Sequence, residues 1–97
     1  MPRTVKIRRI TKSGSRYFSL EAVCEILDLS PRKITLYERR GLIHGRRIQT
    51  PPDPPRAIYP PEEVRRLRRI LLLTKEMGVN LAGVEIILRL LEQLERK

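Results

Sequence analysis

The fold is decided by the stretch SLEAVCEILDLSPRKITLYERRG, residues 19–41. Ser19 and Ser30 are typical N-cap residues, and Pro31 stands at a first helical position, where its missing N–H costs nothing. Apolar residues after each cap recur at the three- and four-residue spacing of one buried helix face, and Gly41 is a typical C-terminal stop. The stretch therefore predicts two short helices joined by a tight turn, a helix-turn-helix.

The second helix, predicted over residues 31–40, has two chemically different faces at about 100° per residue. Its N-terminal residues would lie nearest the base edges if the helix entered a DNA major groove. Arg32 and Lys33 are then predicted to contact guanine edges or phosphates. Thr35 would contact a base edge or phosphate, and Leu36 a thymine methyl group. The basic half holds Arg32, Lys33, Thr35, Leu36, Arg39 and Arg40, and the packing half holds Pro31, Ile34 and Glu38, with Tyr37 at its edge.

The distribution of charge identifies the second helix as the element that reads DNA. The first helix and its end carry three acids, Glu21, Glu25 and Asp28, whereas the second helix carries four basic residues and one acid. Arg39 and Arg40 stand near the C-terminus of the second helix, where the helix dipole favours cations. For these two residues, DNA contact and a solvated helix end are equally consistent with the pattern.

A hairpin is predicted after the second helix. Two short β-compatible segments, residues 46–49 and 56–59, flank the loop TPPDPP, whose prolines oppose further strand pairing. Arg46, Arg47 and Arg56 flank this stiff tip and are predicted to contact phosphates or a minor groove. The alternative is a loop that serves solubility.

Two longer helices complete the predicted fold. The third is predicted over residues 62–77, with Pro61 at its start and Gly78 at its end, and the fourth follows the N-cap Asn80. The fold class is therefore mainly α, a winged helix-turn-helix with four helices and a small β-hairpin wing. A near-heptad stripe on the fourth helix predicts either a dimer interface or closure of the core; its residues are Val84, Ile87, Leu91 and Leu94.

The chain is strongly basic, with 21 Lys and Arg against 11 Asp and Glu in 97 residues and a formal net charge of +10. This length corresponds to one domain. A positive field attracts polyanions, so nucleic acid is the predicted partner. The alternative, a charge that only keeps the chain soluble, would not require so one-sided an excess of basic residues. Six basic and no acidic side chains in residues 1–16 predict a basic N-terminal arm, followed by a DNA-binding domain at residues 17–97.

Other function classes find no support in the sequence. The single cysteine, Cys24, rules out an internal disulfide, and one histidine, His44, is too little for a metal site. No glycine-rich phosphate loop or activated nucleophile is recognisable. We therefore expect neither an enzyme nor a metal or cofactor. Without an apolar run that could cross a membrane, the chain is expected to be soluble, cytoplasmic and nucleoid-associated.

Three segments together resemble the DNA-binding domain of the MerR family of bacterial transcription regulators: YFSLEAVCEILDLSPRKITLYERRGLI, IYPPEEVRRLRRI and MGVNLAGVEII, which begin at Tyr17, Ile58 and Met77. Within that family, GVNLAGV looks most like the HspR-type heat-shock repressors, with the glutamine-synthetase repressors close behind. The chain departs from the family pattern in its wing tip, where prolines replace a glycine-rich segment, and at four further positions. Thr35 and Leu36 replace an arginine and a tyrosine, Ala57 replaces a wing arginine, and Pro60 replaces a serine cap.

The resemblance implies a winged-helix homodimer that binds an inverted-repeat operator on double-stranded DNA. The family's early basic residue in the reading helix falls on Arg32, and its phosphate-contacting tyrosine falls on Tyr37. Members of the family generally pair through a long C-terminal helix. In this chain the corresponding apolar surface is the stripe on its fourth helix. The complete set of predicted DNA-binding residues is Ser30, Arg32, Lys33, Thr35, Leu36, Tyr37, Arg39, Arg40, Arg46, Arg47, Arg56 and Tyr59.

The predicted function is thus a sequence-specific transcriptional repressor, with a chaperone as a candidate co-regulator. One alternative is a protein-interaction module, a chaperone modulator built on the same fold. Such a module would have no reason to keep four cations on one face of the second helix. A DNA-bending accessory factor is a third reading, which a bending assay would distinguish.

Overall fold

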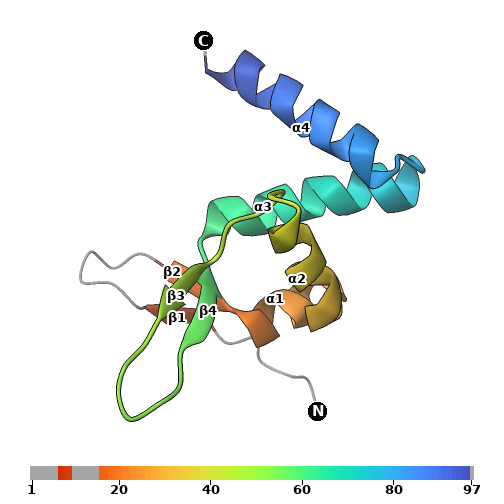
Figure 1. Ribbon diagram of the computed structural model, residues 1–97. Coiled ribbons are helices and arrows are strands. Elements are labelled where there is room, and N and C mark those ends of the chain that lie inside the picture. The colour runs from red at the N-terminus through yellow and green to blue at the C-terminus, as the bar shows by residue number, and fades with distance from the viewer. Residues whose placement is uncertain (1–6, 10–15, 97) are drawn as a thin grey trace. The chain divides into compact units, whose positions relative to one another are not determined.

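The computed structural model describes residues 16–96 and the backbone of residues 7–9 (Figure 1). The protein is mainly helical with a small antiparallel sheet, and the predicted fold class is confirmed. It divides into two compact units, Met1–Arg66 and Leu67–Lys97. In chain order the elements are β1 (Ile7–Arg9), β2 (Arg16–Ser19), α1 (Leu20–Leu27), α2 (Pro31–Arg39), β3 (Arg46–Ile48), β4 (Arg56–Tyr59), α3 (Pro61–Leu71), the π-helical segment η1 (Leu72–Glu76) and α4 (Leu81–Glu95).

The two helices of the helix-turn-helix begin at their predicted caps. The Ser19 hydroxyl accepts a hydrogen bond from the Ala22 N–H at 3.1 Å, and the Ser30 hydroxyl accepts one from the Lys33 N–H at 3.2 Å. Between them the chain turns at Asp28, which adopts a left-handed conformation with φ of 55°. Such a residue cannot continue a right-handed helix. The turn therefore separates α1 from α2 as the sequence predicts.

Four strands form one antiparallel sheet in the order β1-β2-β4-β3. The β3–β4 hairpin is the predicted wing, and its proline-rich loop extends beyond the strands (Figure 1). β1 pairs with β2 in a register that sets Arg8 opposite Tyr17. Residues 1–6 and 10–15 of the predicted arm lie outside the described residues. The division into an arm at 1–16 and a domain at 17–97 stays a prediction.

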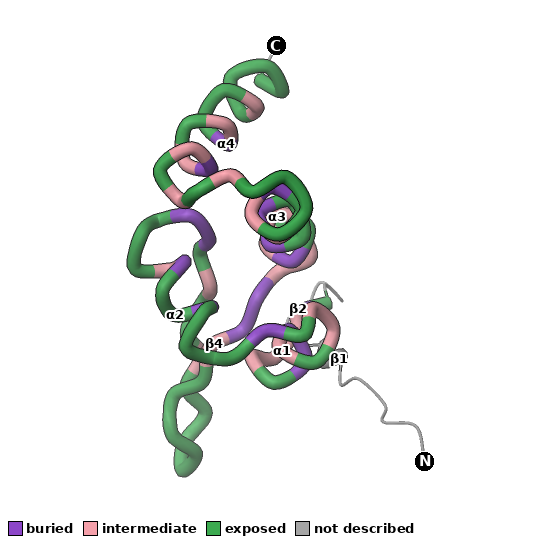
Figure 2. Tube along the Cα trace, turned by 90° about the vertical axis from the view of Figure 1, so that its right-hand side faces the viewer, coloured by how far each residue is buried: buried purple, intermediate pink, exposed green. Residues whose placement is uncertain are grey.

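The first unit has an apolar core between the sheet and its helices. α1 contacts β2, β4 and α2. Figure 2 marks the buried positions along the chain in purple. Because each short helix supplies only two fully covered side chains, strands and loops provide the rest of the core. The buried residues of this unit include Tyr17, Ala22, Val23, Leu29, Ile34, Tyr37, Leu42, Ile43, Ile58, Tyr59 and Val64.

The second unit contains the end of α3, the segment η1 and α4, which contacts η1. The third helix was predicted as α-helical to Met77, but its last turn is wider. The Met77 N–H bonds to the Leu72 carbonyl at 3.2 Å, five residues back, which is π-helical spacing. The chain unwinds here into Gly78, whose φ is 69°. The Asn80 side chain then caps α4 by accepting from the Gly83 N–H at 2.8 Å.

Candidate nucleic-acid interface

The predicted division of α2 into two faces holds for most positions, but Pro31 of the predicted packing half is exposed and Tyr37, predicted at its edge, lies at its centre. Ile34 and Tyr37 are buried, with exposed fractions of 0% and 3%, and Glu38 is half-buried. These positions recur at the spacing of one helical face, which packs inward. All six side chains of the basic half are exposed: Arg32, Lys33, Thr35, Leu36, Arg39 and Arg40. α2 therefore presents one continuous polar and cationic face that surrounds an exposed leucine.

The N-terminus of α2 favours anions. Its first turn contains no acidic residue and holds the two cations Arg32 and Lys33. The positive end of the helix dipole adds to the charge of these side chains. Ser30 is exposed, and its hydroxyl oxygen accepts from the Lys33 N–H while its O–H remains able to donate. This end of α2 is thus suited to phosphates and to the acceptor edges of bases.

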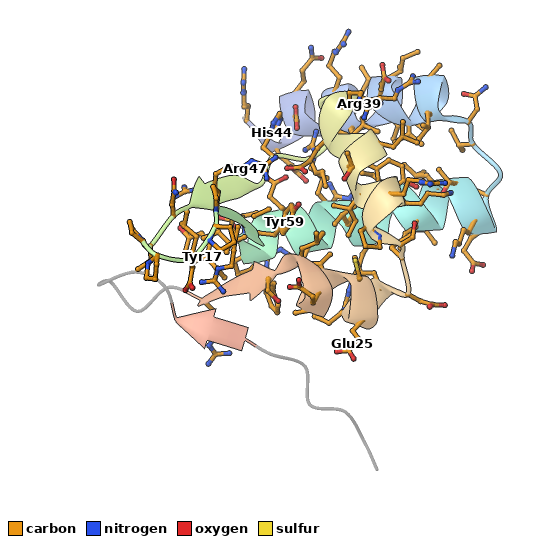
Figure 3. All side chains as sticks on the ribbon, turned by 60° about the horizontal axis from the view of Figure 1, so that its bottom comes forward. Tyr17, Glu25, Arg39, His44, Arg47 and Tyr59 are labelled. Carbon is orange, nitrogen blue, oxygen red and sulfur yellow. The ribbon has the colours of Figure 1, made fainter. Side chains whose placement is uncertain are left out.

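Two tyrosines of the predicted DNA-binding set lie in the core. The exposed fractions of Tyr37 and Tyr59 are 3% and 1%. The Tyr59 hydroxyl donates a hydrogen bond to Glu38 Oε1 at 3.2 Å, so its polar end is used inside the protein (Figure 3). Burial leaves both side chains very little surface for a partner. DNA contact by Tyr37 and Tyr59 therefore stays a prediction, with only these small exposed fractions to make it.

Glu38 connects α2 to the base of the wing. One carboxylate oxygen accepts from the Tyr59 hydroxyl, and the other, Oε2, accepts from the Gly45 N–H at 3.1 Å. Gly45 has no room for a side chain, because a Cβ there would lie 2.6 Å from Tyr59 Cε1 and 2.7 Å from Glu38 Oε2. The carboxylate thus holds the last turn of α2, the residue before β3 and the end of β4 together.

The loop between α2 and β3 is also held by α3. The His44 N–H donates to Glu63 Oε1 at 2.7 Å, and the Arg66 side chain donates to the Leu42 carbonyl. The backbone of His44 therefore has a structural role, although no function is predicted for its side chain. Glu63 is not predicted from the sequence, because it meets His44 across 19 residues and no local pattern marks the contact.

The three wing arginines differ in their surroundings. Arg47 and Arg56 are exposed on β3 and β4 and remain candidates for phosphate contact. The guanidinium of Arg46 instead donates to the Tyr17 hydroxyl at 3.0 Å and lies 5.5 Å from the centre of the Tyr17 ring. Tyr17 is not predicted as a functional residue, because only the pairing of the strands brings it to Arg46. The one signal for Tyr17 in the sequence is an aromatic residue in the segment directly before α1.

The predicted dimer stripe on α4 is only partly exposed. Val84 is fully buried, Ile87 and Leu91 are half-buried, and Leu94 is exposed. The exposed apolar residues of this helix are instead Ile86, Leu90 and Leu94, with exposed fractions of 58%, 54% and 67%. They recur every four residues and so share one face. Val84 is a core residue, and the exposed stripe Ile86–Leu90–Leu94 shares only Leu94 with the predicted one.

The surroundings of Cys24 affect the ionisation of its thiol. Burial and the nearby Glu21 carboxylate raise the pKa of the Cys24 thiol, which disfavours the reactive thiolate. Among the described residues, no group of three or more His, Cys, Asp or Glu side chains could hold a metal ion. In the same part of the chain, no helix is long and apolar enough to cross a membrane.

Comparison with known proteins gives one finding. The sequence model of the family described as MerR HTH family regulatory protein matches residues 18–91, about three quarters of the chain. The matched segment covers α1, α2, the wing and α3 completely, and most of α4. No curated protein and no solved structure matches the chain.

Glu38→Ala is expected to lower the free energy of unfolding by about 1 to 3 kcal/mol, because it leaves the Tyr59 hydroxyl and the Gly45 N–H without their acceptor. Glu38→Gln, which keeps one accepting oxygen, should lose less. Urea unfolding measures both, with Glu76→Ala as the control for loss of an exposed acid. Equal losses in Glu38→Ala and Glu76→Ala would show that the Glu38 contacts do not stabilise the fold.

Stability should fall in alkaline solution because of Tyr59. Burial, and then the Glu38 carboxylate, raise the pKa of Tyr59 far above its ordinary value of about 10. Above about pH 10 the unfolded chain loses this proton while the folded chain keeps it, so the free energy of unfolding decreases as pH rises. Tyr59→Phe should reduce this decrease between about pH 9 and 11. Burial also raises the pKa of Tyr37, so part of the decrease should remain. An identical pH dependence in Tyr59→Phe would contradict the assignment.

Proposed function

We propose that this chain, which belongs to the MerR HTH family of regulatory proteins and is therefore a DNA-binding transcription regulator, represses transcription by binding an inverted-repeat operator as a homodimer. The observation that carries the proposal is the exposed face of α2, where four cations surround Thr35 and Leu36. A module that only bound other proteins would not require this concentration of positive charge on the second helix. The MerR HTH family is one of DNA-binding regulators rather than enzymes.

The first turns of α2 are proposed to read bases. Arg32 has the planar donor fork that pairs with the O6 and N7 atoms of guanine, and Lys33 can donate to the same atoms or to a phosphate. The Leu36 side chain is 37% exposed and lies among the cations of this face. Apolar contact with a thymine methyl would remove it from water on binding. The Thr35 hydroxyl can both donate and accept beside it.

The remaining cations are proposed to fix the position of α2 on the duplex. Arg39 and Arg40 lie at the opposite end of the helix from Arg32, and Arg47 and Arg56 lie on the wing. Contacts to phosphates carry no sequence information, but they set the register and orientation of the reading helix. Each phosphate that a cation neutralises releases counterions, so binding should weaken steeply with salt. The net charge of +10 strengthens the same dependence.

A dimer is proposed because one reading helix contacts too few base pairs to select a site in a genome. Two copies related by a two-fold axis double the contacted sequence and require an inverted repeat. The exposed stripe Ile86–Leu90–Leu94 of α4 is the apolar surface that supports this pairing. Burying three such side chains removes apolar area from water in each subunit, which favours association.

The repressor role rests on the resemblance to HspR-type regulators, and a chaperone is the corresponding candidate co-regulator. Occupation of the operator is sufficient for repression, so it requires only the DNA-binding face of α2 and the wing. Its site of action would be the nucleoid in the cytoplasm.

Selection of bound sequences from a pool of random duplexes tests the function, and the enriched sequences should form an inverted repeat.

Arg32→Ala should then weaken operator binding by about 1 to 3 kcal/mol and relax the preference at one position of each half-site. Arg89→Ala, which removes an exposed arginine of α4, is the matched control. Equal losses on operator and random DNA would identify Arg32 as a phosphate contact, and a pool without enrichment would refute the proposed function.

The double variant Leu90→Glu with Leu94→Glu tests the dimer. It should keep its helical content, bind a half-site, and lose the preference for the full inverted repeat, because the charges cannot be buried between two subunits. Gln93→Glu with Arg96→Gln makes the same charge change at an exposed position of α4 and at its C-cap, and should still prefer the full repeat. Unchanged binding of the full repeat by the leucine variant would place the pairing surface elsewhere.

A further inference from the structure

Arg46, the first residue of β3, is exposed, yet its guanidinium is engaged within the protein. It donates to the Tyr17 hydroxyl at 3.0 Å, and its central carbon lies 5.5 Å from the centre of the Tyr17 ring. A guanidinium near an aromatic face is attracted by the electrons of the ring, and the hydrogen bond fixes its direction. Two different interactions therefore hold one side chain in one place.

The register of the sheet explains how the two residues meet. Ile58 of β4 stands opposite both Ser19 of β2 and Arg46 of β3, so these three positions form one row across the sheet. Side chains alternate between the two faces of a strand, so Tyr17, two residues before Ser19, lies on the same face as this row. Neighbouring strands are about 4.8 Å apart. The long arginine side chain thus reaches across β4, past the buried Ile58, to β2.

This contact bears on the orientation of the wing. β3 is an edge strand whose ladder partner is β4, and β4 pairs with β2 through two register positions, Phe18↔Tyr59 and Ser19↔Ile58. A hairpin attached through so short a ladder can twist about it. The Arg46–Tyr17 contact links the outer strand directly to β2. The preceding residue, Gly45, is bonded to Glu38 of α2, so consecutive residues tie the start of β3 to two different elements.

We propose that Arg46 is a positioning residue, which holds the wing at a fixed angle to α2 through Tyr17 and does not itself contact DNA. The proposal rests on the function proposed above and departs from the sequence-based prediction for Arg46. A guanidinium that moved to a phosphate would give up both the hydroxyl and the ring of Tyr17. Arg47 and Arg56 are then the two arginines of the hairpin that contact phosphates. Lysine could not replace Arg46, because an ammonium lacks the planar fork that donates while lying near the ring.

The test compares an uncharged change at Tyr17 with loss of the charge at Arg46. Tyr17→Leu and Arg46→Gln should each weaken binding to the selected operator by about three- to tenfold, and the double variant should bind no more weakly than either one. Arg46→Lys should not restore binding. The slope of log affinity against log salt should be the same in Tyr17→Leu and Arg46→Gln as in the unchanged protein. The control Arg56→Gln should reduce that slope by about one, as the loss of a phosphate contact does.

Three results would overturn the proposal: operator binding that is unchanged in Tyr17→Leu, full rescue by Arg46→Lys, or a salt slope in Arg46→Gln reduced as in the Arg56→Gln control. Thermal unfolding without DNA separates these outcomes from a failure of the proposed function. The shifts in Tm of Tyr17→Leu and Arg46→Gln should be non-additive whether or not the chain binds DNA. Additive shifts would show that the contact itself does not form. If coupling is observed but the unchanged protein selects no DNA sequence, the proposed function fails while the contact stands.

Discussion

The Glu38 carboxylate is the interaction on which the arrangement of the candidate interface depends. It accepts one hydrogen bond from Gly45, directly before β3, and one from Tyr59, at the end of β4. An ionised acceptor makes stronger hydrogen bonds than a neutral one, and both of its oxygens are used. α2 and the wing are connected by a loop of a few residues, and the Glu38 hydrogen bonds join the two ends of that loop directly. The carboxylate supplies the bond from the packing side of the helix, so the opposite side is left to the cations, Thr35 and Leu36.

In α2, apolar side chains are buried on one side and charged side chains are exposed on the other. Ile34 and Tyr37 are almost completely removed from water, whereas every cation of α2 is exposed. Burying an unpaired cation costs far more than burying a hydrocarbon, so the amphipathic pattern of α2 permits one way of packing it. When the apolar side of α2 packs against the core, its basic side is therefore exposed at the same time. A partner of opposite charge therefore meets the cations on a helix whose backbone is already folded.

The arginines of the sheet illustrate a limit of reasoning from charge alone. Arg46, Arg47 and Arg56 are equivalent in the sequence, each beside the proline-rich loop. In the structure Arg46 is engaged by Tyr17, while Arg47 and Arg56 extend from the exposed parts of the hairpin. The difference arises from register, since Arg46 shares a face of the sheet with Tyr17 and sits across one intervening strand from it. A change of register by one residue would have moved it to the other face.

The sequence by itself determined the local elements of this protein and the faces of its reading helix. The caps Ser19, Ser30 and Asn80, the wing hairpin and the inward side of α2 could all be predicted, because each depends on residues within a few positions of one another. Tertiary structure alone decided that Tyr37 and Tyr59 are core residues, that Glu38 bridges helix and wing, and that the exposed stripe of α4 is Ile86–Leu90–Leu94. It also decided the partners of Arg46 and Glu63, which lie 29 and 19 residues away. Such contacts depend on how strands pair and how helices pack against them, and no periodicity along the chain encodes that pairing.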